Sequence, residues 1–100
     1  MTNHQIALNV VSKAMQVSQK LIVSRCRLGP VVEARHIFIL LLAQNGVNDE
    51  TISWHLNRCR SSITHARHTA TNKVRHSSVF QNKYLLVKER YEHQKSLRIS

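Results

Sequence analysis

The segment 31–45 is apolar on nearly every face of a helix, and the only two glycines and the only proline of the chain stand at its ends. Gly29 and Pro30 precede it, and Gly46 follows it. A Gly-Pro pair typically marks a loop, and a glycine just after the last periodic residue typically ends a helix. Because a helix that is apolar all round belongs in the interior of a domain, we expect 31–45 to be a buried central helix.

The rest of the chain has no glycine or proline, so hairpins and strands are not expected. One hundred residues make one domain, and a hydrophobic fraction of 42% supplies a small core without metal or disulfide bonds. The fold class that we predict is therefore all-α, a compact bundle of five to six helices. A single domain is expected over 1–95, followed by a frayed tail over 96–100.

Polar residues that favour helix N-caps mark the starts of other helices. In chain order, the expected N-caps are Asn3, Ser18, Asn48 or Asp49, and Ser77 or Ser78. The first helix is expected to end near residue 15. The last helix carries an apolar stripe at helical spacing, which consists of Phe80, Tyr84, Val87 and Tyr91.

A further helix, over about 60–74, has only a narrow stripe of small apolar residues. The stripe is Ile63, Ala66, Ala70 and Val74, and the opposite face carries Ser61, His65, His68 and Asn72. Arg67 falls close to the apolar stripe, so we expect its aliphatic part to pack there while its charge reaches solvent. Trp54, on the preceding helix, is expected to cover an edge of the core.

The charge of the chain is large and unevenly distributed. The formal net charge is +10 at pH 7. The segment 58–76 holds five Lys and Arg residues and no acid, whereas 31–57 holds one base against three acids. A small domain this basic is expected to bind a polyanion, with nucleic acid as the first expectation and an anionic membrane surface as the rival.

The segment 57–66, Asn-Arg-Cys-Arg-Ser-Ser-Ile-Thr-His-Ala, places basic and hydroxyl side chains just before and on the first turn of the 60–74 helix. A helix-turn-helix presents its recognition helix to the major groove of DNA in this way. A simpler interpretation is that Arg58 and Arg60 lie on a solvated surface and that Ser61 and Ser62 are helix caps. Their position together at a helix N-terminus, which itself attracts phosphate, favours DNA contact.

Five short motifs follow one another along the chain: Val17-Ser18, Arg25-Cys26-Arg27, Arg35-His36-Ile37, the segment 58–66, and Ser77-Ser78-Val79-Phe80. In their order they resemble the C-terminal DNA-binding domain of the bacterial replication initiator DnaA. The segment 58–66 is similar to that family's signature R-D-H-[TS]-[TS]-V-x-H-A. The resemblance extends over about 6–80, roughly three quarters of the chain. It implies a bundle with a helix-turn-helix, similar also to the Trp repressor.

The resemblance assigns roles to individual residues. It implies that Arg27 enters the minor groove and that Arg35, at the start of the long helix, contacts phosphate. It implies further that Ser61 and Ser62 reach base edges and thymine methyl groups, and that His65 contacts phosphate.

Two positions depart from the family signature. Cys59 and Arg60 replace its Asp-His pair, and an arginine at position 60 is suited to a bidentate contact with guanine. The family's ATPase domain has no counterpart here, since the chain has no Gly-rich phosphate loop. The full set of predicted DNA-binding residues is Arg25, Arg27, Arg35, Arg58, Cys59, Arg60, Ser61, Ser62, His65, His68 and Lys73.

Neither a metal site nor an enzyme is expected. A zinc site needs close pairs of ligands, and His65 with His68 is the only suitable pair, although His55, His76 and Cys59 are nearby in sequence. Arginines beside Cys59 favour its thiolate, but no base and acid accompany it as in a catalytic site. We therefore predict no catalytic residue, no metal and no cofactor.

The sequence also favours a particular compartment. Cys26 and Cys59 are far apart and form no CxxC motif, which indicates a reduced, intracellular protein. Residues 1–11 lack the basic region of a signal peptide. The longest apolar run, 37–43, is far shorter than the roughly 20 residues of a membrane span. We expect a cytoplasmic, nucleoid-associated protein of bacterial or phage origin that does not enter a membrane.

The function that we predict is sequence-specific binding of double-stranded DNA, in a replication-initiator-like or regulatory role. Other replication or regulatory proteins are further expected partners, and the protein is expected to be a monomer or a weak dimer. The alternative is a basic adaptor module that binds a protein partner or RNA.

Overall fold

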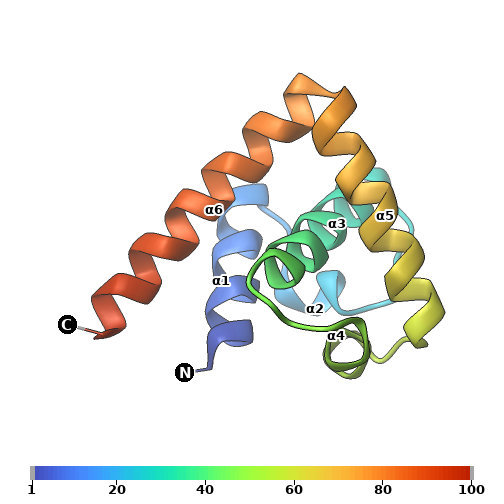
Figure 1. The fold of residues 1–100 in the computed structure, drawn as a ribbon, viewed down its shortest axis with the longest axis horizontal. Coiled ribbons are helices and arrows are strands. Elements are labelled where there is room, and N and C mark those ends of the chain that lie inside the picture. Colours follow the sequence, from blue (N-terminus) through green and yellow to red (C-terminus); the bar gives the residue numbers. More distant parts are fainter. Residues whose placement is uncertain (1, 100) are drawn as a thin grey trace.

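The computed structural model describes the backbone of residues 2–99 and the side chains of residues 2–97. This described part consists of helices, turns and loops without a β-strand, which confirms the predicted all-α class. No helix within it is both long and apolar enough to cross a membrane. The helices in Figure 1 are α1 Asn3–Met15, α2 Gln19–Ile22, α3 Gly29–Gln44, α4 Asp49–Leu56, α5 Arg60–His76 and α6 Ser78–Ile99.

The helix α3 is the central helix of the bundle, as the sequence predicted. It contacts each of the other helices, and Figure 1 shows α1 and α6 on one side of it and α5 on the other. Its side chains Ile37, Ile39 and Leu41 are completely buried. The helix begins at Gly29, earlier than predicted, because Pro30 fits the first turn, where its missing N–H costs nothing. Gly46, with φ of +85°, follows the helix end as expected.

The predicted N-caps are largely confirmed. Ser18, Asn48 and Ser77 each accept a hydrogen bond from the backbone N–H three residues later, at 3.2, 2.8 and 3.2 Å. The prediction for the first helix is one residue off, because Thr2 is the N-cap and Asn3 is already helical. The amide of Thr2 in turn donates to the Gln5 side chain at 3.1 Å, so a capping box starts the chain's first helix.

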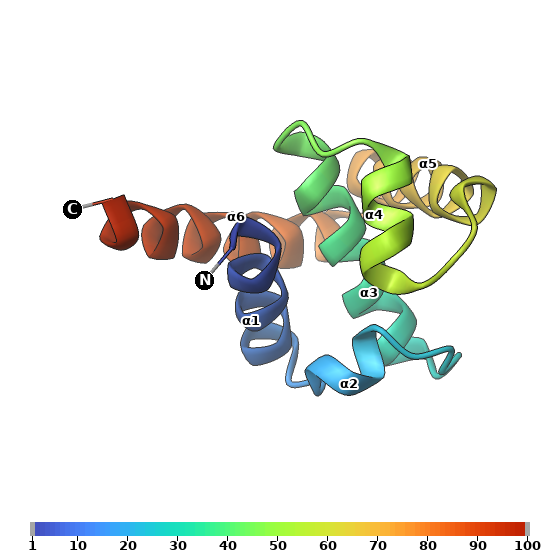
Figure 2. The ribbon, with the colours of Figure 1, turned by 90° about the horizontal axis from the view of Figure 1, so that it is seen from below.

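The helix α6 is longer than the sequence suggested. Its predicted stripe of Phe80, Tyr84, Val87 and Tyr91 is buried against the bundle. The helix continues to Ile99, so residues 96–99 of the expected frayed tail are helical, and residue 100 lies outside the described residues. Figures 1 and 2 both show the C-terminal part of α6 extending beyond the other helices, with α1 beside its middle.

The helices α4 and α5 are joined by a short turn over 57–59 and pack against each other. Asn57 takes the left-handed conformation, with φ 51° and ψ 50°, which asparagine tolerates better than most residues. Leu56 before the turn and Ile63 after it are buried, so both helices are held on the core. The turn therefore needs no glycine, although related turns commonly use one.

Trp54 lies on the solvent side of α4, with 72% of its surface exposed. The expectation that it covers an edge of the core is wrong. Both Ile52 and Leu56 are buried, and a residue two positions away from each is turned by roughly 200° around the helix axis. The indole therefore points away from the core.

Candidate nucleic-acid interface

The outer side of α5 begins with a group of basic and hydroxyl side chains. Arg60, Ser61, Ser62, His65 and His68 are all exposed. A shallow hollow of about 610 Å³ lies along this side of the helix, from Arg60 to His68. The opposite side of the helix is packed on the core, so the predicted division of α5 into an apolar and a polar face is confirmed.

Cys59 is the N-cap residue of α5, and its side chain is exposed. Its Sγ lies 3.4 Å from Oγ of Ser61 and 3.0 Å from Oγ of Ser62. Hydrogen bonding from Ser61, and after it from Ser62, lowers the pKa of the Cys59 thiol to about 7. The polar face of α5 therefore starts with a group whose charge changes near neutral pH, at a helix end that favours a negative charge.

The loop between α2 and α3 contributes two further exposed arginines, Arg25 and Arg27. Arg58, in the turn before α5, donates from Nη2 to the carbonyl oxygen of Ser24 at 2.9 Å. This hydrogen bond joins the basic loop to the turn of the helix pair, although the two segments are far apart in sequence. The loop arginines and the first turn of α5 are thus parts of one surface.

Arg35 does not lie where the resemblance implied. It is only 5% exposed, and its guanidinium donates to four backbone carbonyls rather than facing solvent. The acceptors are Ile22 at 2.8 Å, Cys26 at 3.0 Å, Leu21 at 3.2 Å and Ser24 at 2.7 Å. Burial, and after it the charge of Arg58, lowers the pKa of Arg35. The predicted phosphate contact is therefore wrong, and Arg35 instead holds the basic loop in shape.

Two more predicted DNA contacts are directed into the protein. Arg58 is half-buried, and its Nε is buried with no hydrogen-bond partner among the described residues. Lys73 places Nζ 3.1 Å from Nδ1 of His36 and 5.6 Å from the centre of the Phe80 ring. Because Lys73 has only donors, Nδ1 of His36 accepts. Both basic residues therefore connect helices or loops, a role that the sequence did not predict, and their DNA contacts stay predictions.

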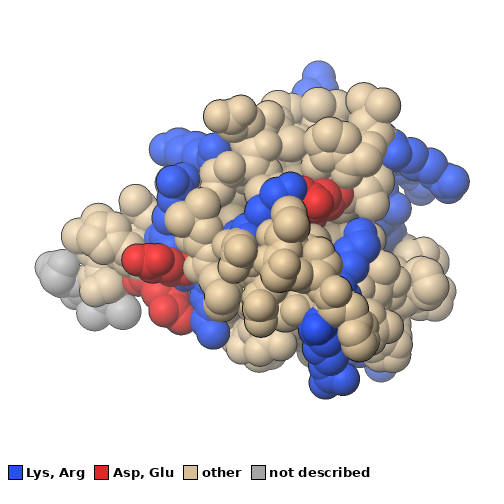
Figure 3. Space-filling view, turned by 90° about the horizontal axis from the view of Figure 1, so that it is seen from above, with Lys and Arg blue, Asp and Glu red and all other residues tan. Residues whose placement is uncertain are grey.

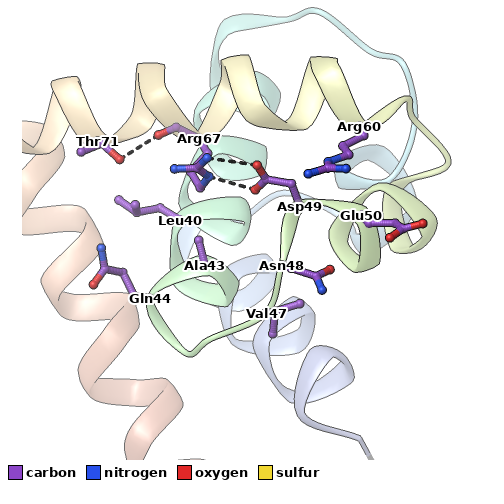
Figure 4. A pocket seen from close by; sticks show the side chains of 10 residues that line it. All are labelled: Leu40, Ala43, Gln44, Val47, Asn48, Asp49, Glu50, Arg60, Arg67 and Thr71. Carbon is purple, nitrogen blue, oxygen red and sulfur yellow. Dashed lines mark hydrogen bonds and ion pairs between the residues drawn. The ribbon is translucent and has the colours of Figure 1, made fainter.

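Arg67 forms an ion pair instead of extending into solvent. Its Nε and Nη2 donate to Oδ1 and Oδ2 of Asp49 at 2.9 and 3.0 Å, and Thr64 Oγ1 donates to Oδ2 at 2.8 Å. The hydrogen bond from Arg67 is the main cause of a lowered pKa at Asp49. Figure 4 shows this pair in a cavity of about 530 Å³ towards which Arg60 also extends. The pair fastens the start of α4 to the middle of α5.

Basic side chains are not confined to the polar face of α5. Figure 3 shows Lys and Arg at many places on the face seen from above, with acidic side chains gathered in only two places. The positive charge is therefore spread over this face and is not a property of α5 alone. What distinguishes the α5 surface is the arrangement of its hydroxyl and basic side chains, not the amount of charge.

A cavity of about 400 Å³ lies beside the basic loop, between parts of α3 and α5. Arg27 and Arg58 line it from the loop and the turn, and Ser62 and His65 line it from α5. His36 of α3 also lines it, and the sequence prediction did not include this residue. The signal that was available is that His36 is one of few polar residues in a mostly apolar helix and directly follows Arg35.

The charges around this cavity affect His36. Burial lowers the pKa of His36, and the positive charges of Lys73, Arg35 and His65 lower it further, while Glu33 acts in the opposite direction. The result is a pKa of about 4, so the ring is neutral at physiological pH. The neutral ring accepts at Nδ1 from Lys73, which leaves its proton on Nε2.

Within the described residues, no group of three or more His, Cys, Asp or Glu side chains is placed to hold a metal ion. The geometry can instead contact an extended anion, through hydroxyl, guanidinium and imidazole groups on α5 and the neighbouring loop. Comparisons with protein families, with curated proteins and with solved structures find no match to this chain.

Proposed function

We propose that the protein binds double-stranded DNA in a sequence-specific manner, with the first turns of α5 in the major groove. Arg60, Ser61 and Ser62 contact base edges, and His65 and His68 contact phosphates. Arg25 and Arg27 of the neighbouring loop contact the adjacent backbone or minor groove. The role is non-enzymatic, either initiator-like or regulatory, in the cytoplasm and in association with the nucleoid.

The observation that carries this proposal is the hydrogen bond between Arg58 and the Ser24 carbonyl. It fixes the basic loop beside the start of α5, so two DNA-contacting elements have a set separation before DNA arrives. Such preorganisation lowers the ordering cost of binding. The major groove is wide enough for an α-helix, and its base edges are distinguishable there.

The exposed residues at the start of α5 support base contacts as well as phosphate contacts. Arg60 is exposed, and its guanidinium forms no hydrogen bond with the described residues, so it is available to guanine O6 and N7. Ser61 and Ser62 are short and exposed, which suits donor or acceptor contacts to base edges. The sequence resemblance to the initiator domain supports the same use of this helix.

Two measurements test the proposal. Selection of bound sites from a pool of random duplexes is expected to enrich one short sequence, with a guanine that Arg60 contacts. Binding of the enriched duplex is expected to weaken steeply with salt, because each neutralised phosphate releases counterions. Recovery of unenriched sequences, or affinity that is constant between two ionic strengths, would contradict sequence-specific DNA binding.

A second candidate function is a basic adaptor for RNA or for a protein partner, favoured by the basic side chains spread beyond α5 (Figure 3). In its RNA form it predicts equal affinity for single-stranded RNA and for random duplexes, without an enriched sequence, and in its protein form it predicts no enrichment from either pool. The same selection experiment, repeated with an RNA pool, separates the two functions.

A further inference from the structure

The cavity between α3 and α5 is lined on several sides by groups that favour an anion. Arg27, Arg35 and Arg58 contribute positive charge, and His36 and His65 contribute imidazole groups. No Asp or Glu is among its lining residues. A cavity with this lining has a positive potential, and low-dielectric walls concentrate that potential.

Hydrogen-bonding capacity remains available at the same place. The hydroxyls of Ser62 and Thr69 line the cavity. Arg27 is exposed at the loop and forms no hydrogen bond with the described residues, so its charge is available.

The remaining wall of the cavity is apolar and consists of Val32, Ile39, Ile63 and Ala66. A free phosphate ion makes no favourable contact with an apolar wall, whereas the carbon atoms of a sugar ring do. The volume of about 400 Å³ lies within the range of roughly 300–1,000 Å³ that is usual for small-ligand sites. The cavity therefore matches a phosphate group together with the sugar that carries it.

We infer that this cavity binds one sugar-phosphate unit, with the phosphate between Arg27 and His65, near the charge of Arg58, and the sugar against the partly exposed Val32 and Ala66. Two sources supply such a unit, the backbone of a DNA strand and a free nucleotide. The inference deepens the proposed DNA-binding function, and only its backbone source rests on that function.

His36 provides a readout inside the cavity. Its ring is kept neutral by burial and by the positive charges of Lys73, Arg35 and His65. A bound phosphate introduces a negative charge, and an opposite charge within about 4–6 Å raises the pKa of such a base by roughly one unit or more. A histidine outside the cavity, such as His55 on α4, has no reason to shift by as much.

The test is a pH titration of the histidine rings by NMR on the whole chain, with and without thymidine 5′-monophosphate, and with thymidine as the uncharged control. The nucleotide is expected to raise the pKa of His36 from its value of about 4, and thymidine is expected to leave it unchanged. The inference is overturned if the nucleotide leaves the pKa of His36 unchanged, or if the pKa of His55 shifts equally.

A matched pair of variants in the basic loop tests the location. Arg27→Gln removes a charge that lines the cavity, and Arg25→Gln removes an exposed neighbouring charge that does not. Arg27→Gln is expected to weaken nucleotide binding about tenfold, as loss of a charged hydrogen bond does, and Arg25→Gln by much less. Equal weakening by both variants would show general attraction by the basic surface and would overturn the inference.

Duplex DNA of the selected sequence distinguishes the two sources. If the duplex also raises the pKa of His36 and the nucleotide competes with it, the cavity takes a backbone phosphate. If the duplex binds without moving His36 while the nucleotide moves it, the cavity takes a free nucleotide. If the nucleotide moves His36 and no duplex binds, the cavity inference stands and the DNA-binding function fails. If a duplex binds and the nucleotide leaves the pKa of His36 unchanged, the DNA-binding function stands and the cavity inference fails.

Discussion

Arg35 and Arg58 donate hydrogen bonds to the same carbonyl oxygen, that of Ser24, at 2.7 and 2.9 Å. Arg35 comes from the central helix and Arg58 from the turn before α5. Each donates from its Nη2, so two positive charges converge on one point of the basic loop. The shape of that loop and its place beside α5 therefore depend on the same backbone atom.

Replacement of Arg35 is expected to destabilise the fold strongly. Arg35→Met removes four hydrogen bonds to backbone carbonyls, and the carbonyls of Ile22 and Cys26 are left without a donor, which makes the loss about 3 kcal/mol or more. For a domain of this size, thermal unfolding is then expected to show a melting temperature lower by more than about 10 °C. Arg25→Met in the same loop serves as the control, because Arg25 is exposed. Similar melting temperatures for both variants would contradict the structural role of Arg35.

The role of Arg58 can be separated from phosphate contact by the salt dependence of DNA binding. A residue that neutralises a phosphate contributes about 0.9 to the slope of log affinity against log salt. Arg58→Met is expected to weaken binding while the slope stays constant, because Arg58 acts by positioning Ser24. Arg27→Gln is expected to lower the slope by about one unit. A lower slope for Arg58→Met would identify Arg58 as a phosphate contact after all.

The ion pair between Asp49 and Arg67 predicts a loss of stability in acid. The pKa of Asp49 is lowered in the folded state, mainly by Arg67, so the pair stabilises the fold above the unfolded pKa of about 3.9 and ceases to do so as the pH falls through the folded value. Asp49→Asn is expected to cost about 1–2 kcal/mol at pH 7. The difference in unfolding free energy between Asp49→Asn and the unmodified chain should vanish near pH 2.

Glu50→Gln is the matched control for this measurement. Glu50 and Asp49 both lie in the first turn of α4, where negative charge is favourable, but only Asp49 bonds to Arg67. Urea denaturation of both variants across pH 2–7 separates the helix-terminus effect from the ion pair. An equal loss of unfolding free energy in the two variants would show that the ion pair with Arg67 adds nothing to the helix-terminus effect.

The titration of His36 makes stability depend on pH a second time, between pH values of about 4 and 6.5. Its folded pKa of about 4 lies below the ordinary value of 6.5, so the unfolded chain binds more protons between these values and stability falls as the pH is lowered. The fall is expected to be about 1–2 kcal/mol, discounted for the solvent that reaches a half-buried ring. His36→Asn keeps an acceptor for Lys73 but cannot titrate, so its stability curve should be flatter. Parallel curves would show that His36 titrates normally.

Alkylation of Cys59 is expected to follow a titration with its midpoint near pH 7. The thiolate is the reacting form, and hydrogen bonds from Ser61 and Ser62 lower the pKa of this thiol to about 7. Rates of reaction with iodoacetamide in a Cys26→Ala background measure the midpoint. The Ser61→Ala, Ser62→Ala double variant should move it upward. A midpoint unaffected by the double variant would contradict the hydrogen-bond explanation.

The sequence was sufficient to predict most of the helices because their boundaries depend on local chemistry. Apolar periodicity placed Phe80, Tyr84 and Tyr91 on the buried side of α6, and capping side chains marked most helix starts. The end of α6 was misplaced because no apolar stripe or breaker marks it. The contacts of α6 with α1 come from the fold and not from the local sequence.

The candidate site was less predictable because the use of a basic side chain depends on distant partners. Arg35 looks like a surface arginine at a helix start, and only the fold brings the carbonyls of α2 and its loop around it. Lys73 likewise finds His36, which lies 37 positions away in sequence. The exposed group at the start of α5 was predicted correctly in position because it depends on the phase of a single helix. Whether those residues contact DNA stays a prediction.

Trp54 has a practical consequence for every experiment on this chain. It is the only tryptophan, and its indole is already 72% exposed in the folded protein. Its emission spectrum is set by water before denaturation as well as after, so intrinsic fluorescence is a poor monitor of folding here. The same exposure makes it a sensitive reporter of any molecule that covers α4, because such contact moves the indole out of water.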